Sequence, residues 1–234
     1  MATLNEVMAE LEAGGSAQTR KTYSRHGITE PMFGVSYALL GKLQKKIKRD
    51  HALALQLWAT GNHDARILAI MIADPQAATS AQLDQWIADS NNYGLTDAIA
   101  GYAAQTPLAL EKLKQWTQAD GEWIETAGWG ILGGIARSDP SLPDDFFKPY
   151  LDHIEAHIHT AKNRVRYNMN SAVINIGLRN AGLQTLAVDA AGRIGYVEVD
   201  HGLTNCKTPD AIAYIEKTLA HREGKVKAKP RRAG

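Results

Sequence analysis

The sequence predicts an all-α protein in which antiparallel helix pairs stack into a curved α-solenoid. Apolar residues recur at helical spacing along most of the 234 residues. The helices come in pairs joined by short polar loops, and the second helices begin at similar but unequal distances, near Asn62, Asn91, Gly121 and Asn163. Such spacing is typical of HEAT-like repeats, in which each pair buries its apolar face against the next.

A closed helical bundle is the alternative, because short loops alone do not distinguish the two architectures. We expect about a dozen helices, which favours a solenoid. Residues 123–135 are apolar nearly all round, as a helix packed between two neighbours must be.

Three helices are expected in the first third of the chain. Residues 35–47 place Val35 and Leu39 at helical spacing, and their second half is rich in lysine. Two short apolar helices follow at 51–59 and 64–73, separated by a Thr-Gly-Asn turn.

The rest of the chain is also predicted to be helical. The further helices are expected over residues 80–88, 94–104, 107–117, 122–136, 145–160, 164–178, 183–194 and 208–220. Thr79 and Pro107 mark two helix starts, because a threonine hydroxyl caps free backbone amides and proline is tolerated in the first turn. Residues 195–200 carry a strand-like alternation that a short loop explains equally well.

The composition argues against a membrane protein and against a disulfide-rich one. No apolar run approaches the roughly 18 residues of a membrane span, and the N-terminus has no secretory pattern. Cys206 is the single cysteine, which excludes an internal disulfide framework and a multi-cysteine zinc site. We therefore expect a cytoplasmic monomer that needs neither metal nor cofactor.

The net charge of +1 conceals an uneven distribution. Basic residues gather at the C-terminus: Arg222, Lys225, Lys227, Lys229, Arg231 and Arg232. We assign residues 1–221 to the solenoid and 222–234 to a basic, disordered tail. Without that tail the chain carries more acids than bases, so phosphate contacts must come from local basic patches or from the tail itself.

Two local basic patches could follow a phosphate backbone along a concave groove. The first comprises Lys42, Lys45, Lys46, Lys48 and Arg49, with Arg20, Lys21 and Arg25 upstream. The second comprises Lys162, Arg164, Arg166 and Arg179. A solvated helix face is the alternative for either patch.

Asp97 and the tryptophans are candidate ligand-binding residues. Asp97 lies in the expected first turn of a helix that begins near Tyr93, where a carboxylate beside an aromatic ring could stabilise a cation. The alternative is a carboxylate that stabilises the helix N-terminus. Trp116, Trp123 and Trp129 recur around one helix pair and could stack on bases, although such spacing is also usual for core residues.

Two further groups have simple structural explanations. His153 and His157 have the i, i+4 spacing that lets two imidazoles share a metal, and His159 follows them, but exposed histidines on a polar face fit equally. His201 and Cys206 could form a thiolate nucleophile oriented by Asp200, although turn chemistry also explains this loop.

Several stretches, in this order and spacing, resemble the DNA alkylation repair family, the AlkD-like alkylpurine DNA glycosylases. They are residues 23–28 and 33–35, 57–69, 123–129 (Trp-Ile-Glu-Thr-Ala-Gly-Trp), 165–180 and 199–211. The resemblance covers residues 20–220 and identifies the chain as a divergent member. It implies a HEAT-like solenoid that binds duplex DNA in its concave face.

Active members of that family remove purines alkylated at N3 or N7, whose positive charge makes the base a good leaving group. The resemblance implies that a carboxylate and aromatic faces stabilise the cationic deoxyribose, and that the same carboxylate positions the attacking water. No base needs to be flipped into a pocket for this chemistry, unlike in most glycosylases.

The family's functional positions fall on four residues of this sequence. Its Trp-x-x-x-Asp element corresponds to Tyr93 and Asp97, which are the catalytic candidates. Its phosphate-binding arginine corresponds to Thr126, and its second catalytic tryptophan to Ser171. Serine has no aromatic face and threonine no guanidinium, so two of the four functions are not retained.

We therefore expect DNA binding in preference to efficient excision. The expected DNA-binding positions are Lys42, Lys45, Lys46, Thr126, Arg164, Arg166, Ser171 and Arg179, with Trp123 and Trp129 lining the lesion. The alternatives are a non-catalytic nucleic-acid-binding solenoid and a protein-interaction scaffold, which is a common use of such folds.

Overall fold

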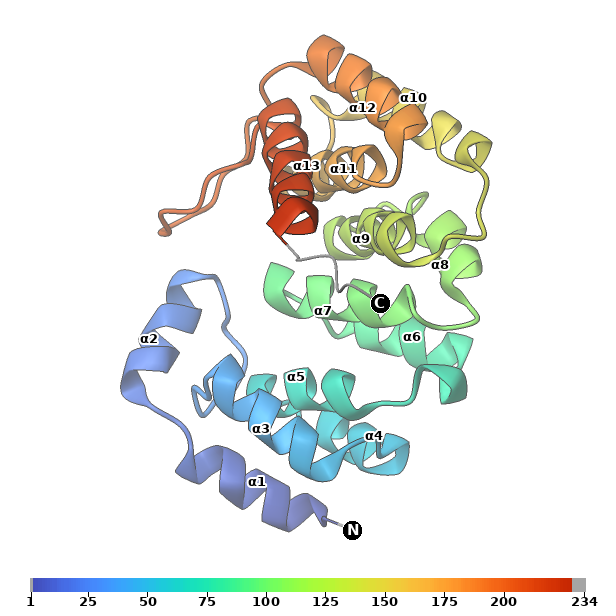
Figure 1. Cartoon of the computed structure of the whole chain (residues 1–234). Helices are drawn as coiled ribbons and strands as arrows, with labels where there is room; N and C mark the ends of the chain where they lie inside the picture. The colour runs from blue at the N-terminus through green and yellow to red at the C-terminus, as the bar shows by residue number, and fades with distance from the viewer. Residues whose placement is uncertain (1, 229–234) are drawn as a thin grey trace. The chain divides into compact units, whose positions relative to one another are not determined.

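A computed structural model describes residues 2–228, and within that range every regular element is helical (Figure 1). The contacts divide the chain into two compact units. The first reaches to Ile131 and includes His201–Cys206, and the second comprises Leu132–Asp200 and the chain from Lys207. The single solenoid domain expected over residues 1–221 stays a prediction.

The first unit consists of short helices joined by tight turns. Its helices are α1 (Leu4–Ala13), α2 (Ala17–Arg25), α3 (Tyr37–Ile47), α4 (His51–Ala59), α5 (His63–Ile72), α6 (Ser80–Ala88), α7 (Tyr93–Ala103) and α8 (Ala109–Trp116), with most of α9 (Glu122–Ser138). The core contains Trp58 stacked on Trp86, with ring centroids 4.4 Å apart, and Tyr102 beside Trp86. Asp50, Asn62, Thr79 and Asn92 cap four of these helices through their side chains.

The second unit contains the end of α9 and four further helices. These are α10 (Lys148–His157), α11 (Asn163–Gly177), α12 (Ala181–Ile194) and α13 (Ala211–Ala228). Helix α11 packs against both α12 and α13. A Cβ atom on Gly177 would lie 2.6 Å from Ile215 and 3.0 Å from Ala187, so this glycine lets the three helices approach closely.

The structure differs from the predicted elements at both ends of the chain. Helices α1 and α2 were not predicted, because α1 buries only Val7 and Leu11, and α2 buries no residue. At the other end, α13 continues to Ala228, into the segment assigned to a disordered tail. Residues 229–234 of that tail lie outside the described residues.

Two internal predictions also change. Residues 195–200 form no strand. The helix expected over 145–160 is a short 3-10 turn, Asp144–Phe146, followed by α10, in which Pro149 occupies the first turn. None of the helices in the described range is long and apolar enough to cross a membrane.

Candidate nucleic-acid interface

Asp64 fixes the loop that leads into α3. Its side chain is buried within the first unit and accepts three backbone N–H bonds, from Phe33 at 2.7 Å, Gly34 at 2.9 Å and Val35 at 2.8 Å. Gly34 has a φ of +78°, a conformation that favours glycine. This loop therefore determines where α3 begins and where Tyr37 is held.

Aromatic side chains gather next to this loop. The Tyr23 hydroxyl donates to the Val35 carbonyl at 2.6 Å. The Tyr23 ring contacts the rings of Tyr37, with centroids 6.5 Å apart, and His63, with centroids 5.5 Å apart. These contacts attach α2 to the start of α3, although α2 buries no residue of its own.

The predicted catalytic pair lies on α7. Tyr93 is the first residue of α7, and its hydroxyl contacts Nδ1 of His26, with the two rings edge to face. Asp97 is exposed one turn later. Burial raises the pKa of Tyr37, and the negative charges of Asp97 and then Asp64 raise it further. Tyr37 is nevertheless 54% exposed, so a phenol face and a carboxylate share one accessible surface.

A buried polar network holds the start of α7. The Glu30 carboxylate accepts hydrogen bonds from Arg66 at 2.6 Å and Asn92 at 3.1 Å, and contacts Nδ1 of His63 at 3.0 Å. Burial alone would raise the pKa of Glu30, but the bonds from His63 and Arg66 hold it below its ordinary value. Asn92 also caps α7 by accepting from Leu95, so this network positions Tyr93.

The first basic patch is exposed on α3. Lys46 pairs with Glu10 at 2.5 Å and Arg49 with Asp74 at 3.3 Å. Lys42 and Lys45 are exposed and have no ion-pair partner within residues 2–228. The same holds on α2 for Lys21 and Arg25. We call Lys21, Arg25, Lys42 and Lys45 the α2–α3 cations.

The second predicted patch is largely occupied by contacts within the protein. Arg164 is buried, and its guanidinium lies 4.4 Å from the Tyr167 ring. Arg166 donates to the Ala161 and Glu198 carbonyls at 2.7 and 3.3 Å. Arg179 donates to three backbone carbonyls beyond the end of α9 and in its last turn. These arginines therefore have structural roles within the second unit.

The predicted lesion-facing residues of α9 differ in exposure. Thr126 is 0% exposed and Trp129 is 1% exposed, which places both in the core. Trp123 is half-buried, as is Ser171 on α11. Trp116 is in the core and donates to Asp84 at 3.1 Å. The structure does not bring Thr126 and Trp129 to the surface that carries Asp97.

The remaining candidates show simple local contacts. The rings of His153 and His157 stack with centroids 4.2 Å apart, and the Nδ1 atom of His157 contacts the His153 carbonyl at 2.8 Å. In the part of the chain that the structure describes, no three His, Cys, Asp or Glu side chains form a possible metal site. Cys206 is exposed.

Sequence reasoning missed Tyr37 and His26. His26 lies within residues 23–28, one of the stretches that resemble the family, but it contacts Tyr93, 67 positions away. A basic run that begins just after an exposed tyrosine, as on α3, is the signal that could have identified Tyr37.

The fold and this surface define a helical-repeat protein with an exposed carboxylate, tyrosines and unpaired cations. The chain belongs to the DNA alkylation repair enzyme family, whose family model matches residues 7–215. Two similar relatives are the uncharacterized proteins Lin0241 of Listeria innocua and Lmo0209 of Listeria monocytogenes. They are 29% and 30% identical over 223 residues, which span 93% of this chain and 97% of each relative.

A solved structure confirms the predicted fold. It is described as "a new family of proteins related to the HEAT-like repeat DNA glycosylases with affinity for branched DNA structures". It is 30% identical, covers 94% of this chain and 95% of its own, and has a TM-score of 0.86. The all-α, HEAT-like prediction is therefore confirmed.

Proposed function

We propose that the protein binds DNA through the α2–α3 cations and has DNA binding, not efficient base excision, as its main activity. The observation that carries this proposal is that these four side chains are exposed without ion-pair partners in the described range. A cation that no carboxylate neutralises can displace counterions from DNA phosphates. The affinity of the solved relative for branched DNA supports a nucleic acid as the partner.

The packing of α3 supports the same surface. Leu40 and Leu43 are buried on one side of α3. Lys42 and Lys45 point to the opposite side by helical geometry, so both can reach one ligand. Tyr23 attaches α2 to the start of the same helix through its contact with Tyr37.

The test is fluorescence anisotropy of a labelled four-way junction and of a linear duplex, measured across a salt series. We expect the logarithm of the affinity to fall linearly with the logarithm of salt concentration. The double substitution Lys42→Gln, Lys45→Gln should make that slope shallower by about 2, since each phosphate contact contributes about 0.9. Tighter binding of the junction would identify branched DNA as the preferred ligand.

The control for that experiment is Lys114→Gln, which removes an exposed lysine on α8. It should leave both affinity and slope unchanged. An affinity that does not depend on salt, or a double variant with the native slope, would contradict the proposed surface.

A second candidate function is slow excision of cationic alkylpurines. The exposed position of Asp97, close enough to Tyr37 to raise its pKa, favours it. A carboxylate at such a surface could stabilise a cationic deoxyribose. Tyr93 lies one turn before Asp97 on the same helix, and its hydroxyl contacts Nδ1 of His26.

We expect Asp97→Asn to lower the release of 7-methylguanine from methylated DNA by about 100-fold, because it removes the stabilising negative charge. Asp120→Asn, an exposed acid before α9, is the matched control and should leave the rate unchanged. Chromatography of the released bases measures the rate. A native protein that releases no more base than buffer alone would eliminate this candidate.

A further inference from the structure

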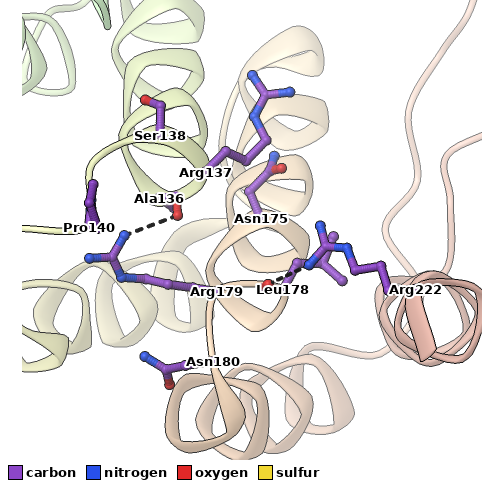
Figure 2. A pocket seen from close by; sticks show the side chains of 9 residues that line it. All are labelled: Ala136, Arg137, Ser138, Pro140, Asn175, Leu178, Arg179, Asn180 and Arg222. Carbon is purple, nitrogen blue, oxygen red and sulfur yellow. Dashed lines mark hydrogen bonds between the residues drawn. The ribbon is translucent and has the colours of Figure 1, made fainter. Parts of the chain in front are cut away.

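A polar pocket of about 580 Å³ lies within the second unit and shares no residue with the proposed DNA surface. Figure 2 shows three of the lining arginines: Arg137 from the end of α9, Arg179 from the turn between α11 and α12, and Arg222 from α13. Arg179 points to the Ala136 carbonyl and Arg222 to the Leu178 carbonyl. Asn175 and Asn180 also line it. The volume lies in the range of about 300–1,000 Å³ that is usual for small-ligand sites.

The charge of this lining is entirely positive. Three guanidinium groups contribute to it, and none of the described residues that line it is acidic. Of the carboxylates near the α9 end of the pocket, Asp139 accepts from Ser141 at 2.5 and 2.9 Å, and Asp144 accepts from the lining residue Asn180 at 2.8 Å. An anion in the pocket would therefore meet a net positive field.

The three arginines differ in how many hydrogen bonds their guanidinium groups already donate to the protein. Arg179 is committed to the carbonyls of Ala136, Asp139 and Leu142. One guanidinium nitrogen of Arg222 donates to the Leu178 carbonyl at 2.9 Å, and the other N–H groups of this side chain can bind a ligand. The Arg137 guanidinium has no hydrogen-bond or ion-pair partner among residues 2–228.

We propose that this pocket binds a phosphomonoester of nucleotide size, with Arg137 and Arg222 as the groups that bind the phosphate. Arginine presents paired N–H donors that match phosphate oxygens, and two such groups from different helices can bind one dianion together. Arg179 holds the wall of the pocket by fixing the end of α9. Asn175 and Asn180 hold the pocket wall, because their side-chain amides donate to the Ser171 carbonyl at 2.7 Å and to Asp144 at 2.8 Å.

The phosphate can come from a free nucleotide or from the 5′ end of a DNA strand. The proposal does not rest on the α2–α3 cations, because it uses other residues in the other unit. Its failure would therefore leave the DNA-binding proposal in place.

The test is isothermal titration calorimetry of the full chain with inorganic phosphate, deoxyadenosine monophosphate and deoxyadenosine. We expect saturable binding of the first two with dissociation constants below about 1 mM, and none of deoxyadenosine, which lacks the phosphate. The double substitution Arg137→Gln, Arg222→Gln should weaken binding by about 100-fold, about tenfold for each arginine. Lys217→Gln, which removes an exposed lysine of α13 outside the pocket, should bind like the native chain.

Binding of hairpin DNA that carries either a 5′-phosphate or a 5′-hydroxyl then distinguishes a DNA strand end from a free nucleotide as the source of the phosphate. Tighter binding of the phosphorylated hairpin, lost in Arg137→Gln, Arg222→Gln, identifies a strand end, and equal binding of the two hairpins identifies a free nucleotide. Circular dichroism melting should show that the double variant is folded like the native chain. Native protein that binds neither phosphate nor the monophosphate, or a folded double variant with native affinity, would overturn the proposal.

Discussion

Replacing Asp64 with alanine is expected to lower the free energy of unfolding by about 4 kcal/mol. Asp64 is 0% exposed and accepts the N–H groups of Phe33, Gly34 and Val35, all within 2.9 Å. Alanine would leave three backbone donors without their acceptor, each at a cost of about 1–3 kcal/mol. Urea denaturation followed by circular dichroism measures the change.

Two further variants test whether the loss of stability in Asp64→Ala comes from the missing hydrogen-bond acceptor. Asp64→Asn keeps the size of the side chain but offers fewer acceptor sites to the same donors, so we expect a smaller loss. Glu12→Gln removes an exposed acid of α1 and should change stability by less than about 0.5 kcal/mol. A loss below about 1 kcal/mol for Asp64→Ala would show that the loop keeps its conformation without the carboxylate.

The same substitution also connects the loop to DNA binding. Tyr37 follows this loop directly, and Tyr23 attaches α2 to it through the Val35 carbonyl. Loss of the loop should therefore weaken DNA binding in the folded fraction of Asp64→Ala, although the α2–α3 cations themselves are unchanged.

Helices were predictable from the sequence where capping and burial agree. The predicted ranges 51–59 and 80–88 coincide with α4 and α6, which begin after the capping residues Asp50 and Thr79 and bury an apolar face. Helix α2 has the same kind of cap in Ser16 but no buried residue, so hydrophobic periodicity gave no signal for it.

The candidate site was predictable only within single segments. Tyr93 and Asp97 lie one turn apart on α7, and their spacing alone places them together. Tyr37 and His26 reach the same surface through packing between distant segments, which spacing does not reveal. The sequence shows that Arg179 is a cation but not which group accepts its hydrogen bonds. In the structure its guanidinium donates to three backbone carbonyls of the protein itself.

Arg179→Ala is expected to lower the free energy of unfolding by about 3 kcal/mol. The side chain donates to the Ala136, Asp139 and Leu142 carbonyls at 3.2, 2.6 and 2.7 Å, where the end of α9 lacks helical partners. Its guanidinium also lies 4.9 Å from the ring centroid of Phe147, which is buried. Thermal melting should show the loss.

Two comparisons separate this structural role from the DNA contact that the sequence suggested for Arg179. Arg179→Lys keeps the charge but cannot reach three carbonyls with one ammonium, so it should still lose about 2 kcal/mol. Arg193→Ala breaks an ion pair with Glu155 at the protein surface, where solvent screens the charges, so it should leave the stability close to that of the native chain. If Arg179→Lys is as stable as the native chain while Arg179→Ala loses only DNA affinity, charge alone matters at this position, and the helix-end role is wrong.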